Sequence, residues 1–65
     1  MTTTYYVRRQ GEDWHLELED RRLEVAGTRA SVLRAARTLA LLNAGRVVVE
    51  QDDGSWEDHE VSPFQ

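Results

Sequence analysis

The residues best suited to chemistry lie close together near the C-terminus. Residues 47–60, VVVEQDDGSWEDHE, hold six carboxylates and one histidine in fourteen positions. Carboxylates at this density suit three roles: ligands for a metal ion, an acidic surface for a partner, or the exposed turn and edge of a β-hairpin. The spacing of these side chains, and the elements that carry them, decide among the three roles.

The spacing does not favour a metal site. A calcium-binding EF-hand loop needs acidic or amide side chains at positions 1, 3 and 5, glycine at 6 and glutamate at 12. Here Gly54 directly follows Asp52 and Asp53, which is typical of a tight turn. Glu57 and His59 would share one strand face, but two ligands do not complete a site. We therefore expect no metal and no cofactor.

Catalysis is not expected either. The chain has no cysteine and no lysine, and Ser31, Ser55 and Ser62 fall in helix, turn and tail contexts without a nucleophile-elbow motif. His15 and His59 fall on strand faces that we expect to be solvated. A chain of 65 residues also has little room for an enclosed pocket, so we expect a non-enzymatic protein.

The charge distribution argues against nucleic acid and membranes as partners. Residues 1–46 carry eight arginines and six acids, whereas residues 47–65 carry six acids and no arginine or lysine. The sequence pI is about 5.0, and the arginines are interspersed with acids instead of forming a phosphate track. No apolar run approaches the roughly 20 residues of a membrane helix, and the polar start is not a signal peptide. A cytoplasmic location is the default expectation.

A surface for a protein partner is the remaining interpretation of the acidic stretch. A two-residue turn at Asp53-Gly54, the strongest short hairpin signal in the chain, would place Glu50 opposite Glu57, where the carboxylates repel. Such a pair breaks a local rule, which indicates a functional surface in which Trp56 anchors a partner that the acids attract. The alternative is that the acidic edge only deters aggregation. The candidate partner-binding residues are Glu50, Asp52, Asp53, Trp56, Glu57, Asp58, Tyr6 and Leu41.

The first half of the chain alternates apolar and polar residues with period two, which predicts strands. Two-residue turns at Gly11-Glu12 and Asp20-Arg21 would join these strands and place their apolar residues on one face. Two cross-strand rows result: Val7–Leu16–Val25 and Tyr5–Leu18–Leu23. The opposite face is predicted to be solvated and carries Tyr6, Arg8, His15, Glu17, Glu19, Arg22 and Glu24.

Residues 29 to about 44 are predicted to form a helix. Thr28 is a suitable N-cap, and Gly45 would end the helix. Leu41 faces the polar side, where it is either a lone exposed leucine or a contact for a second copy or a partner. The predicted buried face comprises Val32, Ala35, Ala36, Leu39 and Leu42, with Leu33 and Ala40 flanking it.

These elements predict one α+β domain of two layers over residues 1–65, with an ordered core of about 4–61 and a frayed tail at 62–65. An antiparallel β-meander of three strands comes first, followed by one α-helix and a closing β-hairpin. The helix is expected to pack on one sheet face. The strand order stays open, because the helix could return the chain beside the first strand or beside the second or third.

Several features in this order carry a family resemblance. They are Trp14 at the start of a strand, the helix pattern from Thr28-Arg29-Ala30 through Ala35-Ala36-Arg37 to Ala40, and Val47-Val48-Val49 leading to Asp53-Gly54. Together they resemble a family of short bacterial proteins (domain of unknown function, number 2188) over about Tyr6 to Asp58. Members are basic around the hairpin, whereas this hairpin is acidic. The resemblance implies a small β-rich domain with one helix and no assigned activity.

The expected function is that of a non-enzymatic interaction module. It would bind a protein partner, or itself as a homodimer, through the acidic C-terminal hairpin or the open sheet face. One alternative is an acidic inhibitor that imitates nucleic acid, as small phage-encoded antagonists do. Another is a stand-alone or engineered fold with no binding function.

Overall fold

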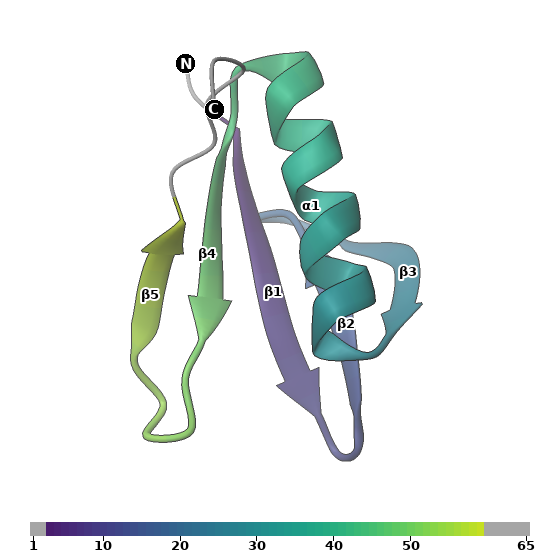
Figure 1. Ribbon diagram of the computed structural model, residues 1–65, viewed down its shortest axis with the longest axis vertical. Coiled ribbons are helices and arrows are strands. Elements are labelled where there is room, and N and C mark those ends of the chain that lie inside the picture. The colour runs from purple at the N-terminus through teal and green to yellow at the C-terminus, as the bar shows by residue number, and fades with distance from the viewer. Residues whose placement is uncertain (1–2, 60–65) are drawn as a thin grey trace.

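The computed structural model describes residues 3–59, so Glu60, Val61 and the tail predicted at 62–65 lie outside the described residues. Within this range, one five-stranded sheet has the order β3-β2-β1-β4-β5, and one helix lies across one of its faces (Figure 1). The elements are β1 (Thr4–Gln10), β2 (Asp13–Glu17), β3 (Arg22–Gly27), α1 (Arg29–Asn43), β4 (Arg46–Glu50) and β5 (Trp56–His59).

The sheet is mixed. The central strand β1 pairs antiparallel with β2 on one side and parallel with β4 on the other. A parallel neighbour needs a long crossover connection, and α1 forms part of that connection as the chain passes from β3 to β4. The α+β prediction with one helix is confirmed, but the strand order is not that of a simple meander.

The first hairpin, β1–β2, has the predicted register. Its turn lies at Gly11 and Glu12, and Val7 lies opposite Leu16. Gly11 has a φ of 64°, a left-handed conformation that glycine adopts without strain. The apolar pattern is sufficient to align these strands, because a one-residue slip would turn every apolar side chain to the other face.

The second hairpin, β2–β3, differs from the prediction at its turn. The amide of Leu18 donates a hydrogen bond to the carbonyl of Arg21 at 2.8 Å, which closes the turn one residue before the predicted Asp20-Arg21. Glu17 consequently lies opposite Arg22, but the register shifts farther along the pair, where His15 opposite Ala26 and Trp14 opposite Gly27 match the predicted alignment. The Asp-Arg dipeptide lacks the glycine that a tight primed turn prefers. The apolar residues of β3 still pack against the core, as predicted.

The helix begins and ends close to the predicted residues. Thr28 is the N-cap, and its hydroxyl oxygen accepts a hydrogen bond from the amide of Ser31 at 3.1 Å. Ala44, with a φ of 51°, takes the left-handed C-cap position predicted for Gly45. Gly45 is needed for another reason: a Cβ there would lie 2.8 Å from the carbonyl oxygen of Thr3. Glycine thus permits the close approach of the α1–β4 connection to the start of β1.

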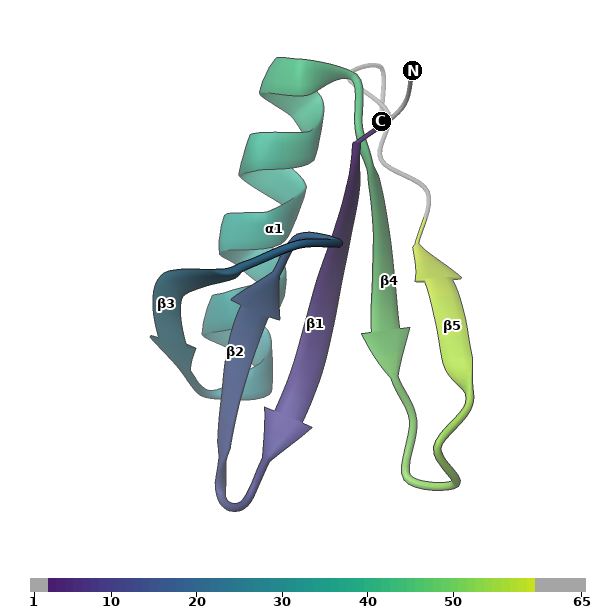
Figure 2. The same ribbon diagram turned by 180° about the vertical axis from the view of Figure 1, so that it is seen from behind.

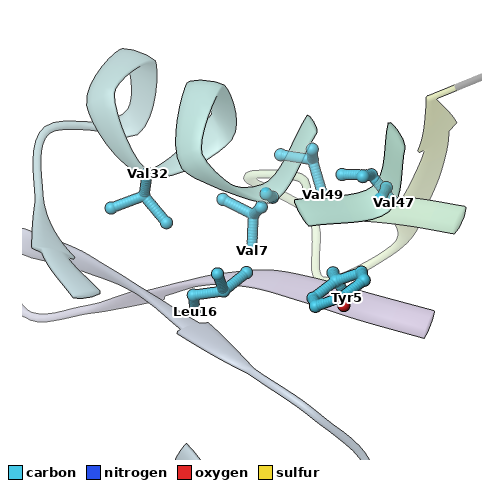
Figure 3. Packing of buried hydrophobic residues seen from close by; sticks show 8 residues of the cluster. Tyr5, Val7, Leu16, Val32, Val47 and Val49 are labelled. Carbon is cyan, nitrogen blue, oxygen red and sulfur yellow. The ribbon is translucent and has the colours of Figure 1, made fainter. Parts of the chain in front are cut away.

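The apolar core lies between α1 and the sheet (Figure 3). It comprises Tyr5, Val7, Leu16, Val32, Ala36, Ala40, Val47 and Val49. The prediction that Leu42 is buried is wrong, because its side chain is 76% exposed. The buried helix residues follow i, i+4 spacing through Val32, Ala36 and Ala40, a row that is inclined to the helix axis. At about 100° per residue, Leu42 lies roughly 120° from the centre of this row.

The β4–β5 hairpin is shifted by one residue from the prediction. The amide of Gln51 donates to the carbonyl of Ser55 at 2.8 Å, so residues 52–54 form a three-residue loop and the predicted two-residue turn is wrong. Gly54 has a φ of 87°, the left-handed conformation required at the last position of such a loop. Asp53 Oδ1 accepts hydrogen bonds from the amide and hydroxyl of Ser55 at 2.9 and 2.6 Å, which stabilises the loop.

Candidate interaction surface

We call the sheet face that α1 leaves uncovered the open face; Figure 2 looks onto it. Side chains alternate between the two faces along each strand, so the residues that alternate with the buried core residues belong to the open face. They include Tyr6 and Arg8 of β1, His15 and Glu17 of β2, Arg22, Glu24 and Ala26 of β3, Arg46, Val48 and Glu50 of β4, and Trp56 and Asp58 of β5.

The shifted register of β4–β5 decides which hairpin residues reach the open face. Glu57 lies opposite Val49, which is buried in the core, and Trp56 lies opposite Glu50. Because a one-residue slip exchanges the two faces of a strand, Trp56 and Asp58 join the open face. The predicted pair of Glu50 opposite Glu57 does not form, and the repulsion expected from it is absent.

Tyr6 and Trp56 form an aromatic pair on the open face. Their ring centroids lie 5.5 Å apart with an interplanar angle of 77°, which is an edge-to-face arrangement. Trp56 is 43% exposed. Edge-to-face contact is a favourable geometry for aromatic rings, and it holds the indole in place while part of its surface remains accessible. Two predicted partner-binding residues that are far apart in the sequence are therefore in contact.

Arg8 connects this aromatic pair with the neighbouring strands. Its guanidinium carbon lies 5.7 Å from the centroid of the Trp56 ring. Its Nη1 atom lies 3.6 Å from Oε1 of Glu17. A guanidinium against an indole is attracted by the negative face of the ring, and the carboxylate attracts the same group from β2. One side chain on β1 thus bridges β5 and β2.

Glu17 gathers side chains from three strands. Its Oε2 atom lies 2.5 Å from Nε2 of His15 and 4.0 Å from Nε of Arg22, in addition to the contact with Arg8. His15 is only 7% exposed, so its predicted solvation is wrong. The ring lies opposite Arg8 on one side and Ala26 on the other, in the interior of the face, where neighbouring side chains cover it.

The acids of the hairpin have arginine neighbours from earlier in the chain. Arg46 forms a salt bridge with Asp58. Nη1 of Arg9 lies 3.9 Å from Oδ1 of Asp52, and the amide of Arg9 donates to Oε1 of Glu50 at 3.1 Å. Exposed ion pairs add little stability, but they offset the negative charge of this quarter of the chain. Residues 47–65 contain no arginine or lysine, so folding brings these cations to the acids: Arg46 pairs with Asp58 across two strands, and Arg9 comes from the first strand.

Two charged groups of the β4–β5 hairpin, Asp53 in its loop and Arg46 at the start of β4, have shifted pKa values. The side-chain and backbone hydrogen bonds from Ser55 lower the pKa of Asp53 below its ordinary value of 3.8. The hydrogen bond and charge of Asp58 raise the pKa of Arg46 above its ordinary range. Both shifts favour the charged form, so these groups carry permanent charge at neutral pH.

The structure does not bring all predicted residues together. Glu57 lies on the helix side of β5, where its Oε1 is 2.7 Å from Nε2 of His59. Leu41 is 47% exposed, as predicted, but it belongs to α1, which covers the other face. Asp52 and Asp53 lie in the hairpin loop. The candidates that share the open face are Tyr6, Glu50, Trp56 and Asp58.

Neither Arg8 nor Glu17 stands out in the sequence as a functional residue. The register of Val7 opposite Leu16 was the available signal, because it places Arg8 opposite His15 on the open face. What the sequence did not reveal is that Trp56 joins them, because the predicted turn paired Glu50 with Glu57 and not with Trp56.

A shallow groove crosses this part of the open face. It is lined by Tyr6, Arg8, Glu17, Leu18, Glu19 and Trp56, and its volume is about 210 Å³. Small-molecule sites usually measure about 300–1,000 Å³ and enclose most of the ligand. The groove therefore suits a single side chain of a larger partner better than a whole small molecule.

Comparisons with protein-family models, curated protein sequences and solved structures found no match. The resemblance to the domain-of-unknown-function family stays a prediction. Residues 3–59 contain no cluster of three or more histidine, aspartate or glutamate side chains arranged to hold a metal ion. In the part of the chain that the structure describes, no helix is both long and apolar enough to cross a membrane.

Proposed function

We propose that this chain is a non-enzymatic interaction module that binds a protein partner or a second copy through the open face. The observation that carries the proposal is the Tyr6–Trp56 pair, an aromatic surface left partly accessible and in contact with Arg8. Tyrosine, tryptophan and arginine are the residue types that contribute most to binding energy at protein interfaces.

The open face also combines the two surfaces that the sequence suggested separately. Trp56 and Asp58 come from the acidic hairpin, whereas Tyr6 comes from the first strand, and all three lie on the same side of the sheet. A partner that approaches the open face would contact the hairpin and the sheet together. The aromatic pair would supply the anchor, and the surrounding charges would orient the partner.

An imitation of nucleic acid receives less support from this arrangement. Such an inhibitor works by presenting carboxylates that stand in for phosphates. Here Asp52 and Asp58 form ion pairs with Arg9 and Arg46, which offset part of their charge, and Glu50 accepts a hydrogen bond from the backbone amide of Arg9. The aromatic surface, in contrast, is not covered by any described element.

Site-specific photo-crosslinking in the native cells tests the proposal. A photoreactive phenylalanine analogue replaces Val48, which lies at the centre of the open face, or Arg34, on the exposed side of α1. Position 48 should give a discrete adduct that is lost in a Trp56→Ser background. An adduct of twice the chain mass identifies a second copy, and another mass identifies a different protein.

The position-34 variant is the matched control for random collisions. Equal adducts from positions 48 and 34, or no adduct from position 48, would contradict the proposal and favour a stand-alone fold. Light scattering across a dilution series measures self-association of the purified chain independently.

A further inference from the structure

We infer that the groove beside Trp56 binds an arginine side chain from a basic segment of the partner, and that this arginine replaces Arg8 against the indole ring. The inference rests on the proposed function and deepens it by naming the chemistry of the partner. Three features carry it: the cation already in place, the acids around it, and the size of the groove.

The first feature is the position of Arg8. Its guanidinium carbon lies 5.7 Å from the centroid of the Trp56 ring, within the distance at which a cation is attracted by an aromatic face. The structure thus shows, within one chain, that this ring accepts a guanidinium. Arg8 is exposed and is held by surface contacts alone, so a competing guanidinium can reach the same ring.

The second feature is the charge around the ring. Glu17 and Glu19 line the groove itself. Glu50 lies opposite Trp56 on β4, and Asp58 follows two residues later on the same face. The chain as a whole carries a net charge of −4. Arg46 offsets the charge of Asp58, and Arg8 and Arg22 offset part of the charge of Glu17. The attraction of a positively charged segment therefore rests on Glu19, on Glu50 and on the net charge of the chain.

The third feature favours arginine over lysine. The groove has a volume of about 210 Å³ and is lined by both an aromatic pair and carboxylates. A guanidinium is planar, stacks on aromatic rings, loses its hydration more readily than an ammonium and can donate to a carboxylate at the same time. Arg8 is already placed between the two groups: it lies against the Trp56 ring and forms an ion pair with Glu17, whose Oε1 is 3.6 Å from its Nη1.

The exchange gives Arg8 the role of an internal competitor. When the partner's guanidinium occupies the ring, Arg8 retains its contact with Glu17, from which its Nη1 atom lies 3.6 Å away. The free chain must give up the Arg8–Trp56 contact before the partner can bind. Removal of Arg8 should therefore tighten binding of the partner, because the Trp56 ring is then free in every molecule and no contact has to be broken first.

A titration followed by ¹H–¹⁵N correlation spectra tests this inference on the full chain. The probe is a short blocked peptide of alternating arginine and glycine. The chain has two tryptophans, so each indole N–H is a separate reporter. Trp14 is a built-in control, because it also has an arginine against its ring, Arg29 at 5.9 Å, but lies on the helix side of the sheet. The indole signal of Trp56 should move and that of Trp14 should not.

Three variants sharpen the test. Arg8→Gln should tighten binding of the arginine peptide by about two- to fivefold, the range typical of one exposed cation–π contact. Arg22→Gln is the matched control, because it also removes a cation from Glu17 but does not touch Trp56. It should change the affinity much less. Trp56→Leu should abolish saturable binding, with the folded state checked by the remaining amide signals.

Several outcomes would overturn the inference: no saturable shift at Trp56, equal binding of a lysine–glycine peptide, or equal tightening by Arg8→Gln and Arg22→Gln. These outcomes are distinguishable from failure of the proposed function. A specific crosslink from position 48 together with no binding of the arginine peptide leaves the interaction module standing and removes only the arginine partner.

Discussion

On the open face, one guanidinium and one carboxylate connect four of the five strands. Arg8 on β1 contacts Trp56 on β5 and Glu17 on β2, and Glu17 also contacts Arg22 on β3. Each exposed ion pair contributes at most about 1 kcal/mol to stability. The main consequence is geometric, because the contacts keep the aromatic ring and the carboxylate at a defined separation across the face.

The end of α1 allows a prediction about two adjacent residues. Ala44 has a φ of 51°, a conformation that costs alanine about 1 kcal/mol and glycine almost nothing, so Ala44→Gly should stabilise the chain by about 0.5–1 kcal/mol. Gly45→Ala should destabilise it by about 1–3 kcal/mol, since its Cβ would lie 2.8 Å from the carbonyl oxygen of Thr3. Urea unfolding measures both changes. A loss of stability in Ala44→Gly would contradict the assignment of Ala44 as the C-cap.

Asp53 leads to a prediction about pH. Hydrogen bonds from Ser55 lower the pKa of the Asp53 carboxyl in the folded chain below 3.8. The ionised carboxylate therefore stabilises the fold fully above pH 3.8, and this stabilisation is lost as the pH falls through the pKa of the folded chain. The difference in unfolding free energy between the wild type and Asp53→Asn should therefore be larger at neutral pH than in acid. Unfolding curves across this range provide the measurement. A difference that does not change with pH would show that the carboxylate charge is not involved.

At the scale of elements, β5 explains why the hairpin register was mispredicted. Among the described elements, β5 is hydrogen-bonded to β4 at the edge of the sheet and is not covered by α1. Its sequence, WEDH, has polar residues on both faces, so no apolar alternation specifies the register. The register therefore depends on the loop, where the left-handed Gly54 and the Asp53–Ser55 hydrogen bonds favour three residues over two.

The register of the β4–β5 hairpin predicts a measurable contact between the rings of Trp56 and Tyr6. With Trp56 on the open face, protons of its indole should show nuclear Overhauser effects to the ring of Tyr6, because the two centroids lie 5.5 Å apart. Effects from Trp56 to core residues under α1, without any to Tyr6, would instead indicate the two-residue turn. Gly54→Ala should weaken the Tyr6 contact, since alanine disfavours a φ of 87°.

At the scale of the whole molecule, stability is limited by size. Among residues 3–59, eight apolar residues form the buried core. Domains of this size rarely gain more than about 3–5 kcal/mol from their core. We therefore expect two-state unfolding with a free energy of about 3–5 kcal/mol in denaturant titrations at low protein concentration. A value above about 8 kcal/mol, or one that rises with concentration, would indicate that association contributes to stability.

The sequence by itself was enough to predict the local elements and one register. The alternation that pairs Val7 with Leu16, the Thr28 cap and the helix that follows it all depend on residues near one another in the chain. Residue propensities and periodicity describe such short-range interactions well. They also predicted Tyr6, Arg8 and Glu17 on one polar face of the first strands.

Only the tertiary structure decided how distant parts meet. The placement of β4 beside β1, the burial of Ala40 rather than Leu42, and the arrival of Trp56 over the open face all depend on packing between segments far apart in the sequence. Several arrangements satisfy the same local pattern, and the long-range fit of α1 on the sheet selects among them. The candidate surface also depends on the tertiary structure, because its central residues come from β1 and β5, which are far apart in the sequence.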